Sequence, residues 1–233
     1  MSTKGKGIFI TGTDTGVGKT YVAEGLIREL RKNGVDVGIM KPAETGCRAH
    51  AGRLVPADAI RLVKASGVRD SLELVNPYRF AHALAPSVAA ELAGKTISPA
   101  KIVNSFRRLS QRHDFIIVEG AGGIMAPLSG KYLYLDLAAA LCLPVVIVAR
   151  PGLGTINHTL LTISAIKKRR LKIAGVVINY AKDRKQGLAE KTSPAALEMV
   201  SGVRVLGIVR TRGVTFEDIV KKIMKPPAKA GAS

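Results

Sequence analysis

The chain has 233 residues, of which 47% are hydrophobic and 23% are charged, a composition that suits one soluble domain with a substantial core. Its two cysteines are too few for a disulfide framework, and no segment has the pattern of a signal peptide or a membrane span, so we expect a cytoplasmic protein. The net charge of +19 would suit nucleic-acid binding, but only 4% of residues are aromatic and the positive charges are scattered. We therefore favour attraction of anionic small molecules over a nucleic-acid partner.

Six runs of strand length, rich in valine and isoleucine, recur along the chain and show little alternation, as expected of parallel strands buried on both faces. They span residues 7–11, 35–40, 115–119, 144–149, 173–179 and 203–209. Helical patterns lie between them: one opens at a glycine-rich loop and stops at Gly34, and others span residues 58–66, 86–93, 99–112, 156–169 and 194–200. The alternation predicts an α/β fold, a doubly wound and mostly parallel sheet with helices on both faces. We expect a single domain over residues 1–224 and a disordered tail over residues 225–233.

The stretch GTDTGVGKT, from Gly12 to Thr20, follows the first strand and opens the first helix. Five residues separate its leading glycine from the Gly-Lys pair, one more than in the usual phosphate-binding loop. Gly16 and Gly18 let the backbone approach phosphates closely, and N–H groups at the helix start bind anions. Lys19 is expected to reach the β- and γ-phosphates, and the Thr20 hydroxyl to bind Mg²⁺. The alternative is a glycine turn with a surface lysine, but the strand–loop–helix context favours a nucleotide site and a P-loop NTPase-like fold.

Two strand ends place charged residues at the same edge of the sheet. Glu119 ends the run FIIVE, and the Gly-Ala-Gly-Gly that follows leaves room for a ligand. A carboxylate there can hold Mg²⁺, and the alternative is a solvated glutamate at a strand end. Lys41 ends the second strand, where another lysine would neutralise charge that develops during phosphoryl transfer. Taken alone, a lysine in that position is more often solvated.

Several motifs occur together and in order: GTDTGVGKT, KPAETG, ADA, VNPYRFAHALAPSVAA, VEGAGGIMAPL, DLAAALCLPVVIVARPGLGTINHTLLT and GVVIN. In these motifs the chain closely resembles the dethiobiotin synthetase family, over residues 7 to about 180. The longer glycine loop is the form that this family uses. The resemblance implies a homodimeric, Mg²⁺-dependent ligase that converts 7,8-diaminononanoate, CO₂ and ATP into dethiobiotin, ADP and phosphate. It implies a carbamate intermediate and then a carbamic-phosphoric anhydride, so the site must gather several anions and hold two amines close together.

The resemblance also implies site residues. Lys19 and Lys41 match the two family lysines beside the γ-phosphate and the carbamate. The matched metal ligands are Thr20, Asp58 and Glu119. The matched nucleotide-binding residues are Gly16, Val17, Gly18, Lys19, Thr20, Tyr21, Asp58, Glu119, Gly120, Ala121, Gly122 and Asn179, the last reading the adenine edge. The matched substrate residues are Thr15, Lys41, Thr45, Leu153, Gly154 and Asn157, the last three on a segment that reaches the substrate across the dimer interface. Without the resemblance, Asp58 would be better interpreted as a helix cap, and Asp136 is interpreted as one.

One position departs from the family pattern, and two other functions compete. Arg210 stands where family members commonly have a proline near the adenine, so the preference for ATP over other nucleoside triphosphates stays open. One rival is a cobyrinic-acid-type amidoligase, which generally carries a glutaminase domain that a chain of this length is not expected to hold. The other is a partitioning-type ATPase that coats DNA, which the charge would suit. Such ATPases place a signature lysine early in the glycine loop, where this chain has Asp14.

Overall fold

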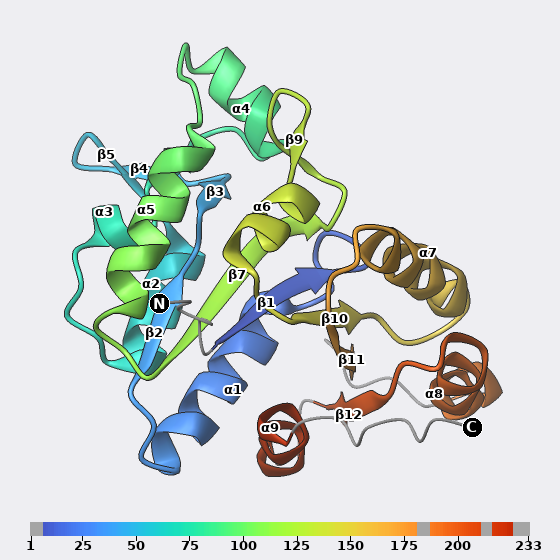
Figure 1. Ribbon diagram of the computed structural model, residues 1–233. Helices are drawn as coiled ribbons and strands as arrows, with labels where there is room; N and C mark the ends of the chain where they lie inside the picture. The colour runs from blue at the N-terminus through green and yellow to red at the C-terminus, as the bar shows by residue number, and fades with distance from the viewer. Residues whose placement is uncertain (1–6, 181–186, 211–215, 226–233) are drawn as a thin grey trace.

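Six parallel strands form one sheet in the computed structural model, which describes residues 7–180, 187–210 and 216–225 (Figure 1). In chain order the strands are β1 (Gly7–Gly12), β2 (Val37–Met40), β7 (Phe115–Gly123), β10 (Val145–Ala149), β11 (Ile173–Asn179) and β12 (Val205–Val209). Their order across the sheet is β12-β11-β10-β1-β7-β2, and every neighbouring pair is parallel. All six correspond to the predicted apolar runs, so the parallel sheet is confirmed.

Helices cover both faces of this sheet because successive strand residues point to opposite sides. Ile8 and Ile10 of β1 pack into one core cluster, whereas Phe9 between them packs into the other. The first face is covered by α1 (Lys19–Lys32), α2 (Ala57–Ser66) and α9 (Glu217–Met224), and the second by α5 (Pro99–Ser110), α6 (Tyr134–Leu141), α7 (Thr155–Lys168) and α8 (Leu188–Ser201). Figure 1 shows α1 and α9 below the sheet and α6 and α7 above it. The predicted doubly wound architecture is therefore confirmed.

The direction of winding changes at β1, and this positions the site. After β1 and α1 the chain skips one place in the sheet to form β2, and β7 later fills the gap between them. The other three strands are added on the opposite side of β1. In open α/β sheets a ligand crevice forms at such a reversal, beyond the carboxyl ends of the strands. The glycine-rich loop leaves β1 at this point.

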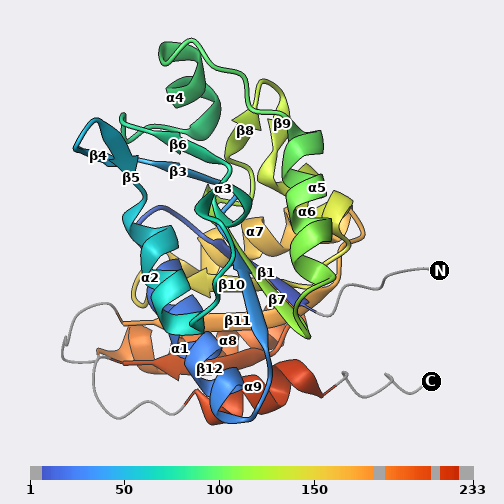
Figure 2. The ribbon, with the colours of Figure 1, turned by 90° about the vertical axis from the view of Figure 1, so that its left-hand side faces the viewer.

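Short elements gather beyond the carboxyl ends of β2 and β7, at one end of the molecule (Figure 2). They are the parallel pair β3 (Ala43–Thr45) and β6 (Tyr78–Phe80), the hairpin β4 (Arg48–His50) and β5 (Arg53–Val55), the hairpin β8 (Pro127–Ser129) and β9 (Tyr132–Leu133), and the helices α3 (Leu72–Val75) and α4 (Pro86–Leu92). The strands among them have two or three residues each, too few to show a periodic pattern in the sequence.

The predicted helices are present, with one large error at a boundary. The helix expected to begin at Pro194 begins at Leu188, and the proline lies inside α8. Pro194 suggested a helix start because proline is favoured in a first turn, where its missing N–H costs nothing. The disordered tail expected over residues 225–233 lies outside the described residues except for Lys225. Within the described parts of the chain, no helix has both the length and the apolarity needed to cross a bilayer.

Candidate active site

The glycine-rich loop connects β1 to α1 at the point where the sheet winding reverses. Gly18, the N-cap of α1, has φ 89°, a left-handed conformation that favours glycine. A Cβ atom at Gly12 would lie 2.6 Å from the carbonyl oxygen of Asp14 and 3.0 Å from Nζ of Lys19. Only glycine therefore lets the loop fold back this closely over the lysine. The first N–H groups of α1 are thereby presented to the crevice, where they can bind an anion.

Lys19 lies inside this loop and not at the surface. Its side chain is buried, and its Nζ donates a hydrogen bond to the carbonyl oxygen of Asp14 at 3.1 Å. Burial and the neighbouring Lys41 ammonium lower the pKa of Lys19 to about 8, although nearby carboxylates oppose the shift. A phosphate group in the loop would supply the negative charge that this lysine lacks, which fits the predicted phosphate-binding role.

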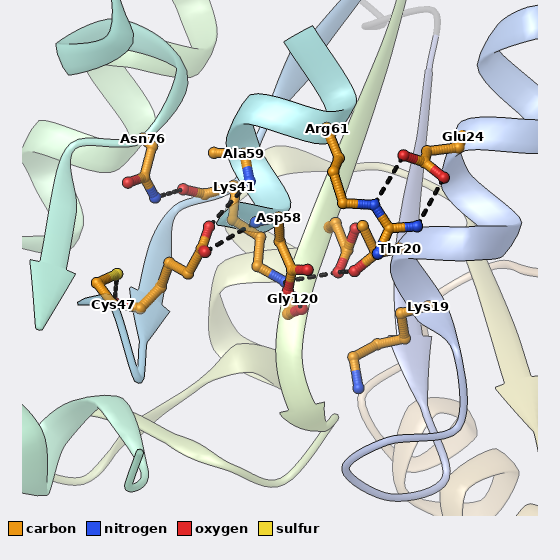
Figure 3. Close-up of polar contacts among 12 residues, drawn as sticks. Lys19, Thr20, Glu24, Lys41, Cys47, Asp58, Ala59, Arg61, Asn76 and Gly120 are labelled. Carbon is orange, nitrogen blue, oxygen red and sulfur yellow. Dashed lines mark hydrogen bonds and ion pairs between the residues drawn. The ribbon is translucent and has the colours of Figure 1, made fainter. Parts of the chain in front are cut away.

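A cluster of charged residues converges beside the loop, centred on Glu119 in the middle of β7. Figure 3 shows its partners Thr20, Lys41 and Asp58. The Oε1 atom of Glu119 accepts a hydrogen bond from the Thr20 hydroxyl at 2.8 Å and lies 2.5 Å from Nζ of Lys41. The same ammonium donates to the carbonyl oxygen of Gly120 at 3.2 Å and lies 3.5 Å from Oδ2 of Asp58. The structure thus brings together one hydroxyl from α1, two carboxylates from α2 and β7, and the lysine that follows β2.

The cluster keeps Lys41 charged in a buried position. Burial alone would lower the pKa of Lys41, but the carboxylates of Glu119 and Asp58 outweigh it and raise the pKa above its ordinary value. Lys41 is 3% exposed and Glu119 is fully buried, so water screens this pair weakly. An ammonium held in this way can neutralise negative charge on a bound substrate.

The oxygen atoms in this cluster also fit a magnesium ion. The Oε2 atom of Glu119 is buried and has no hydrogen-bond partner in the described part of the chain. A buried carboxylate oxygen is usually paired, so this atom is available to bind a cation. With Asp58 and the Thr20 hydroxyl it forms a set of hard oxygen donors. The described residues contain no group of three or more His, Cys, Asp or Glu side chains placed to hold a metal. The remaining positions around a magnesium ion would therefore fall to nucleotide phosphates and water, as is common for this ion.

Glu44 is a residue of the site that the sequence reasoning missed. It belongs to β3, is 5% exposed, and accepts hydrogen bonds from the backbone N–H groups of Asp58 and Ala59, each at 2.9 Å. Its carboxylate thus takes the place of a cap at the N-terminus of α2, where negative charge is favoured. Asp58 itself does not cap the helix, because its carboxylate faces Lys41 (Figure 3). Glu44 adjoins Thr45 in the KPAETG motif, and that adjacency is the only signal in the sequence.

Asn179 closes the other side of the loop, at the carboxyl end of β11. Its Nδ2 donates a hydrogen bond to the carbonyl oxygen of Val17 at 2.9 Å, and its Oδ1 is buried without a partner among the described residues. The side chain also packs against Gly18 so closely that a Cβ there would collide with it. Asn179 therefore holds the loop, and its Oδ1 atom remains available as a hydrogen-bond acceptor.

The other predicted residues lie around this centre. Tyr21 is partly exposed on α1 and meets the ring of Phe216 edge-on. β7 continues through Gly120, Ala121 and Gly122 to Gly123, so Glu119 lies inside the strand and not at its end as predicted. Of the predicted substrate residues, Lys41 is part of the cluster. Thr15, Gly154 and Asn157 are exposed, Leu153 is 88% exposed and Thr45 is half-buried at the end of β3. Asp136 accepts a hydrogen bond from the N–H of Leu133 at 3.0 Å, so it caps α6 as predicted, but from inside the first turn and not from the position before the helix. Arg210 lies over the Tyr180 ring, 6.0 Å from its centre.

The glycine loop at the winding reversal of a parallel sheet defines a P-loop nucleotide-binding protein. A family model described as an AAA domain matches residues 6–214. Among solved structures, the cell division protein MinD of Aquifex aeolicus is similar with a TM-score of 0.56 and 16% identity, covering 93% of this chain and 87% of MinD. A ParA family ATPase of Chlorobium tepidum TLS is similar with a TM-score of 0.54 and 13% identity, covering 94% and 90%. At such low identity these two likenesses show a shared fold only.

Curated relatives with much higher identity give the family. The ATP-dependent dethiobiotin synthetase BioD of Anaeromyxobacter dehalogenans (strain 2CP-C) is 51% identical over 174 residues, which cover 75% of this chain and 76% of the relative. That of Thermodesulfovibrio yellowstonii is 41% identical over 210 residues, covering 87% and 88%. The chain therefore belongs to the dethiobiotin synthetase family, whose members are ATP-dependent cyclo-ligases of biotin biosynthesis.

Proposed function

We propose that this protein joins 7,8-diaminononanoate and CO₂ into the ring of dethiobiotin, with ATP converted to ADP and phosphate. The observation that carries the proposal is the meeting of Lys41, Glu119, Asp58 and Thr20 beside a glycine loop that contains Lys19. A site of this kind gathers positive charge around several anions, which is what phosphorylation of a carbamate requires. The relatives named dethiobiotin synthetase favour this reaction over a cobyrinic-acid-type amidation.

The triphosphate would bind along the glycine loop. Backbone N–H groups of Gly16, Val17, Gly18 and Lys19 would contact its oxygens, and the Lys19 ammonium would bind the β- and γ-phosphates. Thr20, Asp58 and Glu119 would hold Mg²⁺, which when bound supplies charge neutralisation at the phosphates. The free Oδ1 of Asn179 would accept a hydrogen bond from the amino group of the base, with Tyr21 and the Gly120–Gly122 segment lining the site.

Lys41 would act on the reacting carbamate. The carbamate formed on the N7 amine attacks the γ-phosphorus, and the bond to ADP breaks. The N8 amine then attacks the carbonyl carbon of the mixed anhydride, the ureido ring closes and phosphate leaves. Lys41 and Lys19 would neutralise negative charge as it moves between these oxygens, and Thr45 and Thr15 would position the diamine.

We propose further that the enzyme is a homodimer in the cytoplasm, with residues 1–224 as one synthetase domain. Leu153, Gly154 and Asn157 would reach the carboxylate end of the substrate bound to the other protomer. The exposure of Leu153 supports this, since an apolar side chain 88% exposed gains from burial at an interface. Sedimentation as a fully active monomer would contradict the dimer.

The rate of ATP turnover distinguishes the synthetase from a DNA-associated ATPase of the same fold. We expect diaminononanoate together with bicarbonate to stimulate ATP turnover, and DNA to have no effect. Stimulation by DNA, and not by the diamine, would instead support the partitioning-type ATPase. The presence of Asp14 in place of that family's signature lysine supports the first outcome.

A further inference from the structure

The ammonium of Lys41 lies among the same oxygen atoms that the proposed function assigns to the metal. It is 2.5 Å from Oε1 of Glu119 and 3.5 Å from Oδ2 of Asp58, and the Thr20 hydroxyl donates to that same Glu119 oxygen at 2.8 Å. Figure 3 shows Lys41, Asp58 and Thr20 converging, while the Lys19 side chain is turned toward the glycine loop. One pair of carboxylates thus faces two candidate cations.

A lysine and a divalent ion cannot share this pair without strong repulsion. Like charges a few ångströms apart repel each other far more in a buried, weakly screened site than in water. Lys41 and Glu119 are both nine-tenths or more buried, so solvent offers little relief. Mg²⁺ also gives up its water shell reluctantly, and an oxygen already paired with an ammonium is a poorer ligand.

The backbone around Lys41 is held by hydrogen bonds, so only the side chain can move if the ammonium leaves Glu119. The N–H of Lys41 donates to the carbonyl oxygen of Val75 at 2.8 Å, and its own carbonyl oxygen accepts from Nδ2 of Asn76 at 2.6 Å. Asn76 is itself fully buried. The four flexible bonds of the lysine side chain can therefore move its ammonium while the main chain stays in place.

We propose that Lys41 is an internal counter-ion that competes with Mg²⁺ for Glu119 and Asp58. It prevents these carboxylates from binding the metal alone, so the metal enters together with a triphosphate that supplies further negative charge. Metal binding then displaces the ammonium from Glu119, which frees Lys41 for oxygens of the carbamate and the γ-phosphate. Because the ammonium and the metal repel each other at one pair of carboxylates, removal of the lysine charge should strengthen metal binding. The proposal rests on the metal ligands assigned in the proposed function.

The test is the affinity of the full-length, nucleotide-free protein for Mn²⁺, followed by electron paramagnetic resonance as a probe for Mg²⁺. We expect Lys41→Met to bind Mn²⁺ at least about tenfold more tightly than the unsubstituted protein, because one buried positive charge is removed from the ligand set. Lys19→Met is the matched control. It removes a similarly buried lysine of the same site, but its Nζ bonds the Asp14 carbonyl and neither carboxylate, so its affinity should rise much less.

A second variant keeps the test valid if Lys41→Met does not fold. Lys41→Gln keeps a hydrogen-bond donor for Glu119 without the charge, and it should tighten Mn²⁺ binding as Lys41→Met does. With ATP present the difference between variant and unsubstituted protein should shrink, since the triphosphate supplies the compensating charge. Equal tightening in Lys19→Met and the Lys41 variants, or none in either Lys41 variant, would overturn the proposal. Neither result depends on which product the enzyme makes, so a failure here is distinct from a failure to form dethiobiotin.

Discussion

The carboxylate of Glu44 accepts a hydrogen bond from the backbone N–H of Asp58, so a residue of β3 fixes the first turn of the helix that carries a proposed metal ligand. The second oxygen of Glu44 accepts from the next N–H, of Ala59. Burial raises the pKa of Glu44, and these two bonds oppose the shift. Asp58 is free to face Lys41 because another side chain satisfies the helix start.

Replacing Glu44 tests this arrangement. Glu44→Ala leaves one buried and one partly buried N–H group without an acceptor, so we expect the free energy of unfolding to fall by about 1–3 kcal/mol. In Glu44→Gln, which keeps one acceptor oxygen, the free energy of unfolding should fall less. Chemical denaturation measures both. The control is Glu73→Ala, which removes a largely exposed carboxylate and should cost less than about 1 kcal/mol. Equal stability of Glu44→Ala and Glu73→Ala would refute the capping role.

The sheet and the glycine loop could be predicted because their signals are local. Strands buried on both faces have long apolar runs, and all six such runs form the sheet. The loop motif needs only residues adjacent in sequence, and its strand and helix flank it directly. Lys41 and Glu119 could be placed at one edge from the parallel topology alone. Their contact at 2.5 Å joins residues 78 positions apart and required the structure.

The role of Glu44, the start of α8 and the presence of α9 could not be predicted from local sequence patterns. Glu44 acts on a helix 14 residues away, and its role depends on how β3 folds back toward α2. The start of α8 is hard to predict because Pro194 is typical of a first turn. In the structure the Gly187 N–H donates to Glu190, and this contact caps the helix about one and a half turns before the proline. Helix α9 was not predicted, although Ile219 and Val220 bury its inner face.

The two lysines should separate ATP binding from chemistry. Lys19 lies in the phosphate loop, so Lys19→Ala should weaken ATP binding by at least about tenfold and remove most turnover, as loss of a charged hydrogen bond would. Lys41 is paired with carboxylates, so Lys41→Ala should affect kcat more than ATP affinity. Titration calorimetry with ATP and single-turnover kinetics make the comparison. Near-normal turnover in Lys19→Ala, or selective loss of ATP affinity in Lys41→Ala with chemistry intact, would contradict these roles.

The conformation of the loop makes a further prediction at Gly18. An alanine there would adopt an unfavourable positive φ and collide with Asn179, so both thermal stability and ATP affinity should fall. Gly34 is a matched control, with φ 78° and no atom within 4 Å of the added Cβ. Gly34→Ala should cost only the backbone strain, about 1–2 kcal/mol, and should leave ATP affinity unchanged. If Gly18→Ala lost no more stability or ATP affinity than Gly34→Ala, close packing against Asn179 would not be the reason that position 18 requires glycine.

A histidine far from the loop makes stability depend on pH. Nδ1 of His113 lies 2.9 Å from Asp36, and Nε2 lies 2.6 Å from Asp70, which also pairs with Arg112 at 2.7 Å. Burial would lower the pKa of His113, but hydrogen bonds to the two carboxylates outweigh it and raise the pKa above 6.5. The charged imidazole therefore stabilises the fold fully below the unfolded-state value, and this contribution is lost as the pH rises through the folded-state pKa.

His113→Gln should accordingly cost most stability in acid. The difference in free energy of unfolding between the unsubstituted protein and this variant should be larger at about pH 6 than at about pH 9. Urea denaturation at both pH values gives the difference. A cost that stays constant or grows with pH would show that the two carboxylates do not hold the imidazolium.

The transfer of oxygen from bicarbonate to phosphate tests the proposed reaction most directly. The enzyme is incubated briefly with diaminononanoate, ATP, Mg²⁺ and bicarbonate labelled with ¹³C and ¹⁸O, and the products are analysed by mass spectrometry. If a carbamate oxygen attacks the γ-phosphorus, the released phosphate must carry one ¹⁸O, and the ¹³C must appear in the ureido carbonyl of dethiobiotin. Phosphate without the label, or ATP hydrolysis without a ring-closed product, would contradict the account.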